Sequence, residues 1–149
     1  MSGESITHLL FFIAAIVIAV SVIGVVTTNT QSITASYGMG SKSLADQLKT
    51  DITIINDPAA IPFSNSNYSF FVKNTGKSIL DPSTVNMFVD GNYTTNLTYN
   101  VMEGGTFWSP TYVLRLNYSI LNNPALSSGD HTVRVVAGNG VFDTMAFRK

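Results

Sequence analysis

Residues 9–26 read LLFFIAAIVIAVSVIGVV and form an almost purely apolar run, with Ser21 as its one polar side chain, inside a longer segment, Ser5 to Ser41, that lacks Asp, Glu, Lys and Arg. As an α-helix, this run would span roughly 27 Å at about 1.5 Å per residue, close to the roughly 30 Å hydrocarbon core of a bilayer. No Lys or Arg precedes Lys42 and no A-x-A pattern follows the run, whereas cleaved secretory signals usually have both features. We therefore expect a retained helix, with a cleaved signal or a buried soluble helix as the weaker alternatives.

The sequence predicts the start of this helix more clearly than its end. The helix is expected to begin near Glu4 or Ser5, where a serine can cap it and an acidic side chain favours the positive end of the helix dipole. Residues 27–42 are polar and contain two glycines, which is typical of either a weak helical extension or a flexible neck. Residues 43–49 again contain good helix formers, so the helix continues or resumes to about Lys49.

Composition limits what the rest of the chain can be. The 149 residues carry 8 basic and 9 acidic side chains and no cysteine, so beyond the helix there is room for one domain and no disulfide framework. No dense basic run is present, which argues against a nucleic-acid partner. We expect two parts: an N-terminal apolar helix and neck at residues 1–49, and one β-domain at residues 50–149.

After residue 50 the pattern changes to short β-rich runs that are separated by Gly, Pro, Asn and Asp, as expected of a sandwich or barrel. Asn139-Gly140 predicts a tight hairpin with a type I′ turn between the last two runs, because both central residues of that turn need positive φ. The fold class is therefore α+β, with a long apolar helix followed by an all-β domain. The expected strands are Ile52 to Ile55, Tyr68 to Lys73, Val85 to Val89, Asn96 to Met102, Tyr112 to Asn117, His131 to Ala137 and Val141 to Phe147.

Four N-x-[ST] sequons lie beyond the helix and are candidate N-glycosylation sites. They favour a domain outside the cytoplasm, although Lys42 and Lys49 on the same side of the apolar run favour the opposite orientation. The composition of the domain decides for an external location. The candidate asparagines are Asn67, Asn92, Asn96 and Asn117.

Two kinds of contact site are suggested by the sequence. Ala15 and Ala19 form a small-xxx-small pair in the apolar run, and Gly24 adds another small residue, so these three are candidates for helix self-association. Trp108, the only Trp of the chain, is a candidate interface anchor, since exposed aromatic side chains often anchor interfaces. The alternative is that Trp108 plugs one end of the sandwich.

The sequence offers no catalytic, cofactor or metal site. His8 lies in the helix and His131 at a strand start, and neither has the neighbouring His, Asp or Glu that a metal centre or an activated nucleophile requires. We expect His131 to be an ordinary exposed or edge-strand residue. The chain is therefore expected to be no enzyme and to bind no small-molecule substrate.

Three stretches carry a resemblance to a known family: SxxxITHLLFFIAAIVIAVSVIGVV at the start, SLADQLKTDITIINDP after the neck, and FVKNTGKSILDPSTVNMFVDG in the domain. They resemble the FlaG/FlaF family of archaellum stator proteins. The resemblance implies a single-pass helix in the cytoplasmic membrane of an archaeon and an immunoglobulin-like β-sandwich outside it. It also implies self-assembly, a FlaF-like partner, an indirect link to the S-layer, and a static role that resists motor torque.

A second function stays open, that of an archaellin or type IV pilin-like subunit of an extracellular filament. Such subunits also bundle apolar N-terminal helices, and their acidic residue lies at mature position 5. Glu4 here lies one position early, or two if Met1 is removed ahead of Ser2. The two functions differ in whether the helix lies in lipid or among its own copies, and both environments satisfy an apolar helix.

Overall fold

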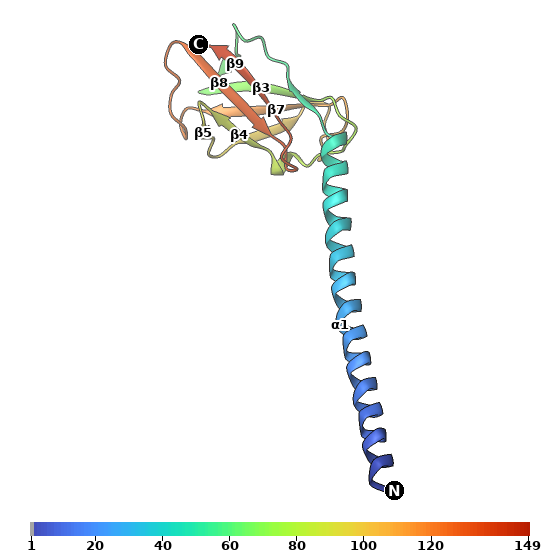
Figure 1. Cartoon of the computed structure of the whole chain (residues 1–149). Coiled ribbons are helices and arrows are strands. Elements are labelled where there is room, and N and C mark those ends of the chain that lie inside the picture. Colours follow the sequence, from blue (N-terminus) through green and yellow to red (C-terminus); the bar gives the residue numbers. More distant parts are fainter. Residues whose placement is uncertain (1) are drawn as a thin grey trace. The chain divides into compact units, whose positions relative to one another are not determined.

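The computed structural model describes residues 2–149 and contains one long helix, α1 (Ser2–Lys49), followed by β-strands (Figure 1). At about 1.5 Å per residue, a helix of 48 residues is roughly 72 Å long. It is long and apolar enough to cross a membrane by length and composition. The polar segment 27–42 is helical throughout, so the weak extension is observed and the flexible neck is not.

The hydroxyl groups of the polar segment bond within the helix. Thr27 donates to the carbonyl of Ile23 at 2.8 Å, and Thr34 donates to that of Thr30 at 2.8 Å. A hydroxyl that bonds the carbonyl four residues earlier leaves the helical backbone bonds in place and needs no water. The same i−4 bond is made by Thr28, Thr30, Ser32 and Ser36.

The chain divides into two compact units, one ending at Lys42 and one running from Ser43 to Lys149. The second unit holds the last turns of α1 and two antiparallel sheets, which confirm the predicted sandwich. One sheet has the order β1-β3-β7-β6, with β2 also paired to β3, and the other has the order β5-β4-β8-β9. The strands are β1 (Ile52–Ile54), β2 (Phe63–Ser64), β3 (Asn67–Asn74), β4 (Asn86–Val89), β5 (Asn92–Tyr93), β6 (Thr98–Val101), β7 (Val113–Ser119), β8 (Asp130–Val136) and β9 (Phe142–Arg148), with a 3₁₀ turn η1 (Pro82–Thr84) before β4.

The seven predicted strands are present, and no end is shifted by more than two residues. The sequence missed β2 and β5, because a strand of two residues is too short to show alternation. Alternation in the longer strands places one face of each sheet in a shared core. The core residues with no exposed surface include Phe70, Val72, Met87, Leu114, Leu116, Val133 and Val135.

The predicted type I′ turn at Asn139-Gly140 is wrong, although β8 and β9 do pair as a hairpin. Only Gly140 has positive φ, at 88°, while Asn139 does not. The Gly140 N–H donates to the Ala137 carbonyl at 2.8 Å and the Ala137 N–H to the Val141 carbonyl at 2.8 Å, which is a three-residue loop with a bulge. A two-residue loop with positive φ at both positions occurs instead at Asp90-Gly91, between β4 and β5.

Candidate functional site

The best-defined feature of the second unit is the junction, the place where the end of α1 meets the loops 75–78 and 137–141. Thr50 is buried, and its hydroxyl donates to the Asp46 carbonyl at 2.7 Å at the C-terminus of the helix. The same hydroxyl accepts a bond from Asn139 Nδ2 at 2.7 Å, while Gln47 Nε2 donates to the Asn139 carbonyl at 2.8 Å. Asn139 of the β8–β9 loop thus binds the helix end through both its side chain and its backbone carbonyl.

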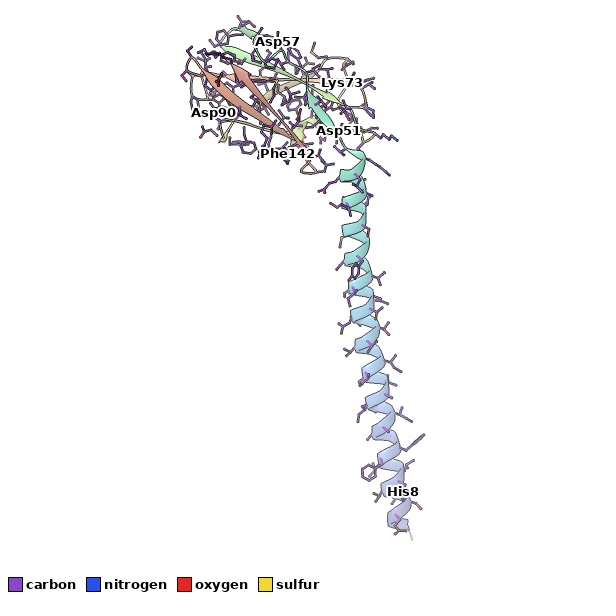
Figure 2. All side chains as sticks on the ribbon, turned by 45° about the horizontal axis from the view of Figure 1, so that its top comes forward. His8, Asp51, Asp57, Lys73, Asp90 and Phe142 are labelled. Atoms are coloured by element: carbon purple, nitrogen blue, oxygen red, sulfur yellow. The ribbon has the colours of Figure 1, made fainter. Side chains whose placement is uncertain are left out.

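The other side of the junction is made by backbone groups of the β3 end. The Lys77 N–H donates to the Lys49 carbonyl at 2.7 Å, and the N–H groups of Thr75 and Gly76 both donate to the Asp51 carbonyl, at 3.0 and 2.9 Å. The bond from Lys77 satisfies the carbonyl of the last helical residue, one of those that a helix end leaves open. Thr75 Oγ1 also donates to the Asp51 carboxylate at 2.6 Å. Asp51, just before β1, and Lys73 of β3, the strand paired with β1, lie close to this side of the domain (Figure 2).

Gly76 is required by space at the junction. A Cβ at this position would lie 2.4 Å from the Asp51 nitrogen and 2.6 Å from the Lys49 oxygen, and both atoms belong to backbone. Gly76 has no positive φ, so backbone conformation does not explain a glycine here. Its role is close approach of two chain segments, which sequence alone does not reveal.

Asn74 links the junction to the core. It has no exposed surface, and its Nδ2 donates to the carbonyls of Ser78 and Trp108, at 2.8 and 3.0 Å. Its Oδ1 accepts from the Gly76 N–H at 3.1 Å. A buried amide with all these bonds fixes the 75–78 loop against the sandwich, because each lost bond would leave an unsatisfied group.

Trp108 lies in the core, with 0% of its surface exposed. Its indole Nε1 donates to the Tyr112 carbonyl at 2.9 Å, and its backbone pairs with Leu80. This placement corresponds to the second interpretation of the sequence, a plug at one end of the sandwich. The exposed aromatic of this loop is Phe107.

The candidate helix-association residues all lie on the exposed surface of α1. Ala15 and Ala19 are four residues apart and share a face of the helix. Gly24 follows Ala15 by nine residues, which at about 100° per residue places it on the opposite face. The helix therefore brings together the two alanines and leaves Gly24 apart from them.

The four sequons fall into two pairs. Asn92 and Asn96 are exposed, at β5 and in the turn before β6. Asn117 is half-buried in the interior strand β7, where it accepts a bond from Ser69 Oγ at 3.0 Å and donates to Thr98 Oγ1 at 3.2 Å. Asn67 is half-buried at the start of β3 and donates to the Asn65 carbonyl at 2.9 Å.

The sequons also differ at the hydroxyl residue. In the Asn92 sequon, Thr94 has 1% exposure and its hydroxyl has no hydrogen-bond partner. In the Asn96 sequon, Thr98 is exposed, and Asn96 itself has positive φ, at 50°. Of the four, only the Asn96 triplet therefore presents both its amide and its hydroxyl at the surface.

The expectation for His131 is wrong: this residue is buried, at 8% exposure, in the interior strand β8. Its Nδ1 lies 2.6 Å from Asp90 Oδ2 and its Nε2 lies 2.9 Å from the Ser127 carbonyl. Asp90 Oδ1 accepts a further bond from the Thr132 N–H at 2.9 Å. The burial of His131 could have been predicted from alternation. Val133, Val135 and Phe147 lie on the inner faces of the last hairpin, and His131 is on the same face of its strand as Val133 and Val135.

The arrangement defines the class of proteins in which one long apolar helix precedes one antiparallel β-sandwich. Within that class, the chain belongs to the archaeal-type flagellin family, whose model matches residues 2–147.

Relatives extend over nearly the whole chain. A protein of Methanocaldococcus jannaschii with the provisional name flagella-related protein G is 28% identical over 149 residues, which cover 95% of this chain and 92% of that protein. An uncharacterized protein of Archaeoglobus fulgidus is 25% identical over 154 residues, with 95% of each chain covered. The family match and the first of these relatives confirm the resemblance to FlaG-like archaellum proteins.

Two solved structures from Sulfolobus acidocaldarius are also similar. The archaellum periplasmic stator protein FlaG has 16% sequence identity and a TM-score of 0.45, with 66% of this chain and 99% of that chain covered. A chain of the archaellum periplasmic stator protein complex of FlaF and FlaG has 17% identity and a TM-score of 0.38, with 62% and 90% covered.

Proposed function

We propose that this protein is a non-enzymatic structural component of the archaellum machinery and acts as a membrane-anchored stator subunit. Its helix crosses the cytoplasmic membrane once, and its β-sandwich lies outside the cytoplasm. Copies of the chain assemble with one another and connect, through a FlaF-like partner, to the S-layer. The family match and the relative named flagella-related protein G support this assignment.

The hydrogen-bonded junction is the structural feature that supports a static role under force. A static component must transmit force between its anchor and its domain without unravelling the connection. Here the residues that end the helix, Gln47 to Asp51, bind two separate loops through side-chain and backbone hydrogen bonds. A flexible linker of Gly and Ser, by contrast, would behave as a random coil and extend under load.

The helix itself supports burial in lipid or among helices. Its apolar run needs no polar partner, and the Ser and Thr hydroxyls that follow it bond to its own carbonyls. Polar side chains that are satisfied within a helix cost less in an apolar environment than unpaired ones. Parallel copies could contact one another along the Ala15 and Ala19 face.

The proposed topology is tested with single cysteines, because the natural chain has none. Leu121→Cys places a thiol in an exposed loop of the domain, and Gly3→Cys is the matched variant near the other end of α1. A membrane-impermeant maleimide should label Leu121→Cys in intact cells and Gly3→Cys only after lysis. Labelling of both or neither in intact cells would contradict the single-pass orientation.

The partner is tested by isolating the tagged full chain from native membranes with mild detergent. Co-isolation of a FlaF-like protein and of further copies of this chain is expected. Recovery of the chain alone, under conditions that keep other archaellum complexes intact, would remove the stator assignment.

The archaeal-type flagellin family match also supports the second candidate, a subunit of an extracellular filament. In that case α1 would lie among copies of itself in a filament core, where its apolar surface is equally satisfied. The two candidates predict different material in culture medium. Abundant chain in sheared extracellular filaments would favour the filament subunit, and retention in membranes would favour the stator.

We further propose that Asn96 carries the N-linked glycan if the domain is exported. Its side chain and that of its sequon threonine are both exposed, whereas Asn67 and Asn117 are half-buried and their amides donate to the Asn65 carbonyl and to Thr98 Oγ1. Mass spectrometry of the native protein should find a glycopeptide at Asn96 that Asn96→Gln removes. A glycan on Asn117 with Asn96 unmodified would overturn this order of accessibility.

A further inference from the structure

His131 connects three segments that are far apart in the sequence. It lies in β8, Asp90 lies in the turn between β4 and β5, and Ser127 lies in the loop of residues 120–129, hereafter the 120–129 loop. Asp90 lies on the other side of the domain from Asp51 and Lys73, so this cluster is separate from the junction (Figure 2). The proposed stator function does not depend on the His131 cluster.

Both ring nitrogens of His131 face groups that accept hydrogen bonds. A carbonyl oxygen is only an acceptor, and an ionised carboxylate is only an acceptor, so both bonds form together only when both nitrogens carry hydrogen. That state is the imidazolium cation. In a neutral imidazole, one ring nitrogen carries no hydrogen and has a lone pair instead. Here that lone pair would face either the Ser127 oxygen or the Asp90 oxygen, and the hydrogen bond to that oxygen would be lost.

The two bonds are not equivalent when the ring loses its proton. Nδ1–H toward the Asp90 carboxylate at 2.6 Å is the shorter, charge-assisted contact, so the remaining proton is best placed there. Nε2 then presents its lone pair to the Ser127 carbonyl, 2.9 Å away. Deprotonation therefore breaks the bond to the 120–129 loop and preserves the one to the β4–β5 turn.

The 120–129 loop covers apolar core residues. Leu126 of this loop is buried, and its neighbour Ser127 accepts the His131 bond. The His131 ring also packs against Phe147 of β9, with ring centroids 5.6 Å apart. Loss of the Ser127 bond loosens the segment that keeps Leu126 over this part of the core.

We propose that His131 is a pH-sensitive latch, which holds the 120–129 loop closed through Ser127 while the imidazole is protonated and releases it when the imidazole loses its proton. The loop keeps its other attachments on either side of the latch. Tyr118 Oη donates to the Pro124 carbonyl at 2.7 Å, and Gly129 and Lys149 exchange backbone bonds at 3.2 and 3.0 Å. In the middle of the loop, Lys149 Nζ also donates to the Leu126 carbonyl, and Ser128 Oγ donates to the Lys149 carbonyl at 3.4 Å. Opening is therefore confined to the segment between Pro124 and Gly129 and works against these two bonds.

The surroundings place the transition on the alkaline side of an ordinary histidine. The Ser127 carbonyl and the Asp90 carboxylate raise the pKa of His131, and burial and Lys149 oppose them without reversing the shift. Burial raises the pKa of Asp90, but the Thr132 N–H and His131 outweigh it and lower that pKa. Asp90 therefore stays ionised while His131 titrates.

The other charged or titratable groups that face the latch are Lys149 and Tyr118. The pKa of Tyr118 is raised by burial and by Asp90, so Tyr118 keeps its proton throughout the titration of His131. Arg148 and Asp130 are exposed, and their side chains lie 3.8 Å apart. Among the groups that face the latch, His131 is thus the one whose charge changes near neutral pH.

The latch is tested first on the natural full chain in detergent micelles. The chain has two histidines, so ¹⁵N-histidine labelling gives two resolvable rings and His8 is an internal control. His131 should show two protonated nitrogens at pH 6 and a pKa above about 6.5, and above that pKa it should keep the proton on Nδ1. A single protonated nitrogen at pH 6, or a pKa at or below that of an ordinary histidine, would overturn the proposal.

Hydrogen exchange of peptides from the 120–129 loop reads the release itself, after normalisation to β3 peptides at each pH. Protection should fall up to about tenfold per pH unit between the ring's pKa in the open and closed states. Protection that does not change across this range would contradict the latch. His131→Gln should give the same low protection at every pH, and the matched variant His8→Gln should keep the pH dependence.

A His131→Gln chain that fails to fold would still leave the measurement on the natural chain decisive. Asp90→Asn adds an independent check, because it removes the carboxylate and keeps its shape. It should lower the pKa of His131 and move the release of the loop to lower pH. An unchanged release would contradict a latch that depends on this pair.

Discussion

The domain holds its two ends in different ways. The junction uses mostly uncharged groups: backbone amides, the carboxamides of Asn74 and Asn139, and a glycine without room for a side chain, with the Asp51 carboxylate as the one charged acceptor among the bonds described. The His131 end uses an ion pair between a histidine and a carboxylate. Neutral hydrogen bonds are unaffected by pH in the physiological range, whereas a histidine pair depends on it. A permanent attachment and an adjustable one thus lie in the same sandwich.

The largest effect is expected where the junction meets the core. Trp108→Ala removes a fully buried indole and should lower the free energy of unfolding by about 3–5 kcal/mol. Denaturant unfolding of the purified chain measures it. Phe107→Ala, an exposed neighbour, is the control and should change little; equal losses for the two variants would contradict the placement of Trp108.

Gly76→Ala should be the next most damaging change. The added Cβ meets backbone atoms of Asp51 and Lys49 at 2.4 and 2.6 Å, so the loop and the helix end must separate, at a cost of about 1–3 kcal/mol. Gly40→Ala is the control, since a Cβ there meets nothing within 4 Å. Thermal melting of both variants checks the difference, and equal stability of the two would refute the close approach.

Asn139→Ala tests the attachment of the β8–β9 loop to the helix end. It removes the bond to Thr50 Oγ1, and we expect a loss of about 1 kcal/mol. Amide exchange of residues 46–51 should increase in this variant. The control Asn100→Ala, at an exposed position, should leave amide exchange at the helix end unchanged. Faster exchange in both variants would mean that the β8–β9 loop does not secure the helix end.

The smallest effect is expected from pH. The raised pKa of His131 contributes stability that is complete below about pH 6.5 and is lost as pH rises through its pKa in the folded state. The lowered pKa of Asp90 contributes stability above about pH 3.8 that is lost as pH falls through its folded-state pKa. The melting temperature should therefore be highest between these limits, and His131→Gln should flatten the alkaline side. An alkaline decline of the same size in that variant would assign it to other groups.

The sequence predicted the parts of this protein that rest on long repeating patterns. The apolar run 9–26 predicted the helix, and β-rich runs between turn residues predicted β3, β7, β8 and β9, each of which is seven or eight residues long. The helical state of residues 27–42 stayed open, since the i−4 hydroxyl bonds that accompany it have no distinct sequence signature.

The residues of the two ends were harder to predict, because their roles depend on contacts between distant segments. Gly76 has the appearance of an ordinary turn glycine until Asp51 and Lys49 are placed beside it. The sequence predicts an ordinary exposed or edge-strand residue at His131, because its partner Asp90 is 41 positions away and the pairing is not visible in the sequence. Trp108 could be an anchor or a plug, and only its position relative to Leu80 and Tyr112 decides between them.

Electron microscopy of the chain isolated from its native cells, with mass spectrometry of its N-terminus on the same material, tests the central claim most directly. The stator account predicts an unprocessed, membrane-retained chain in short assemblies that contain a FlaF-like partner. Long cell-surface fibres built from this chain, with a processed N-terminus, would contradict it and establish the protein as an archaellin or pilin-like filament subunit.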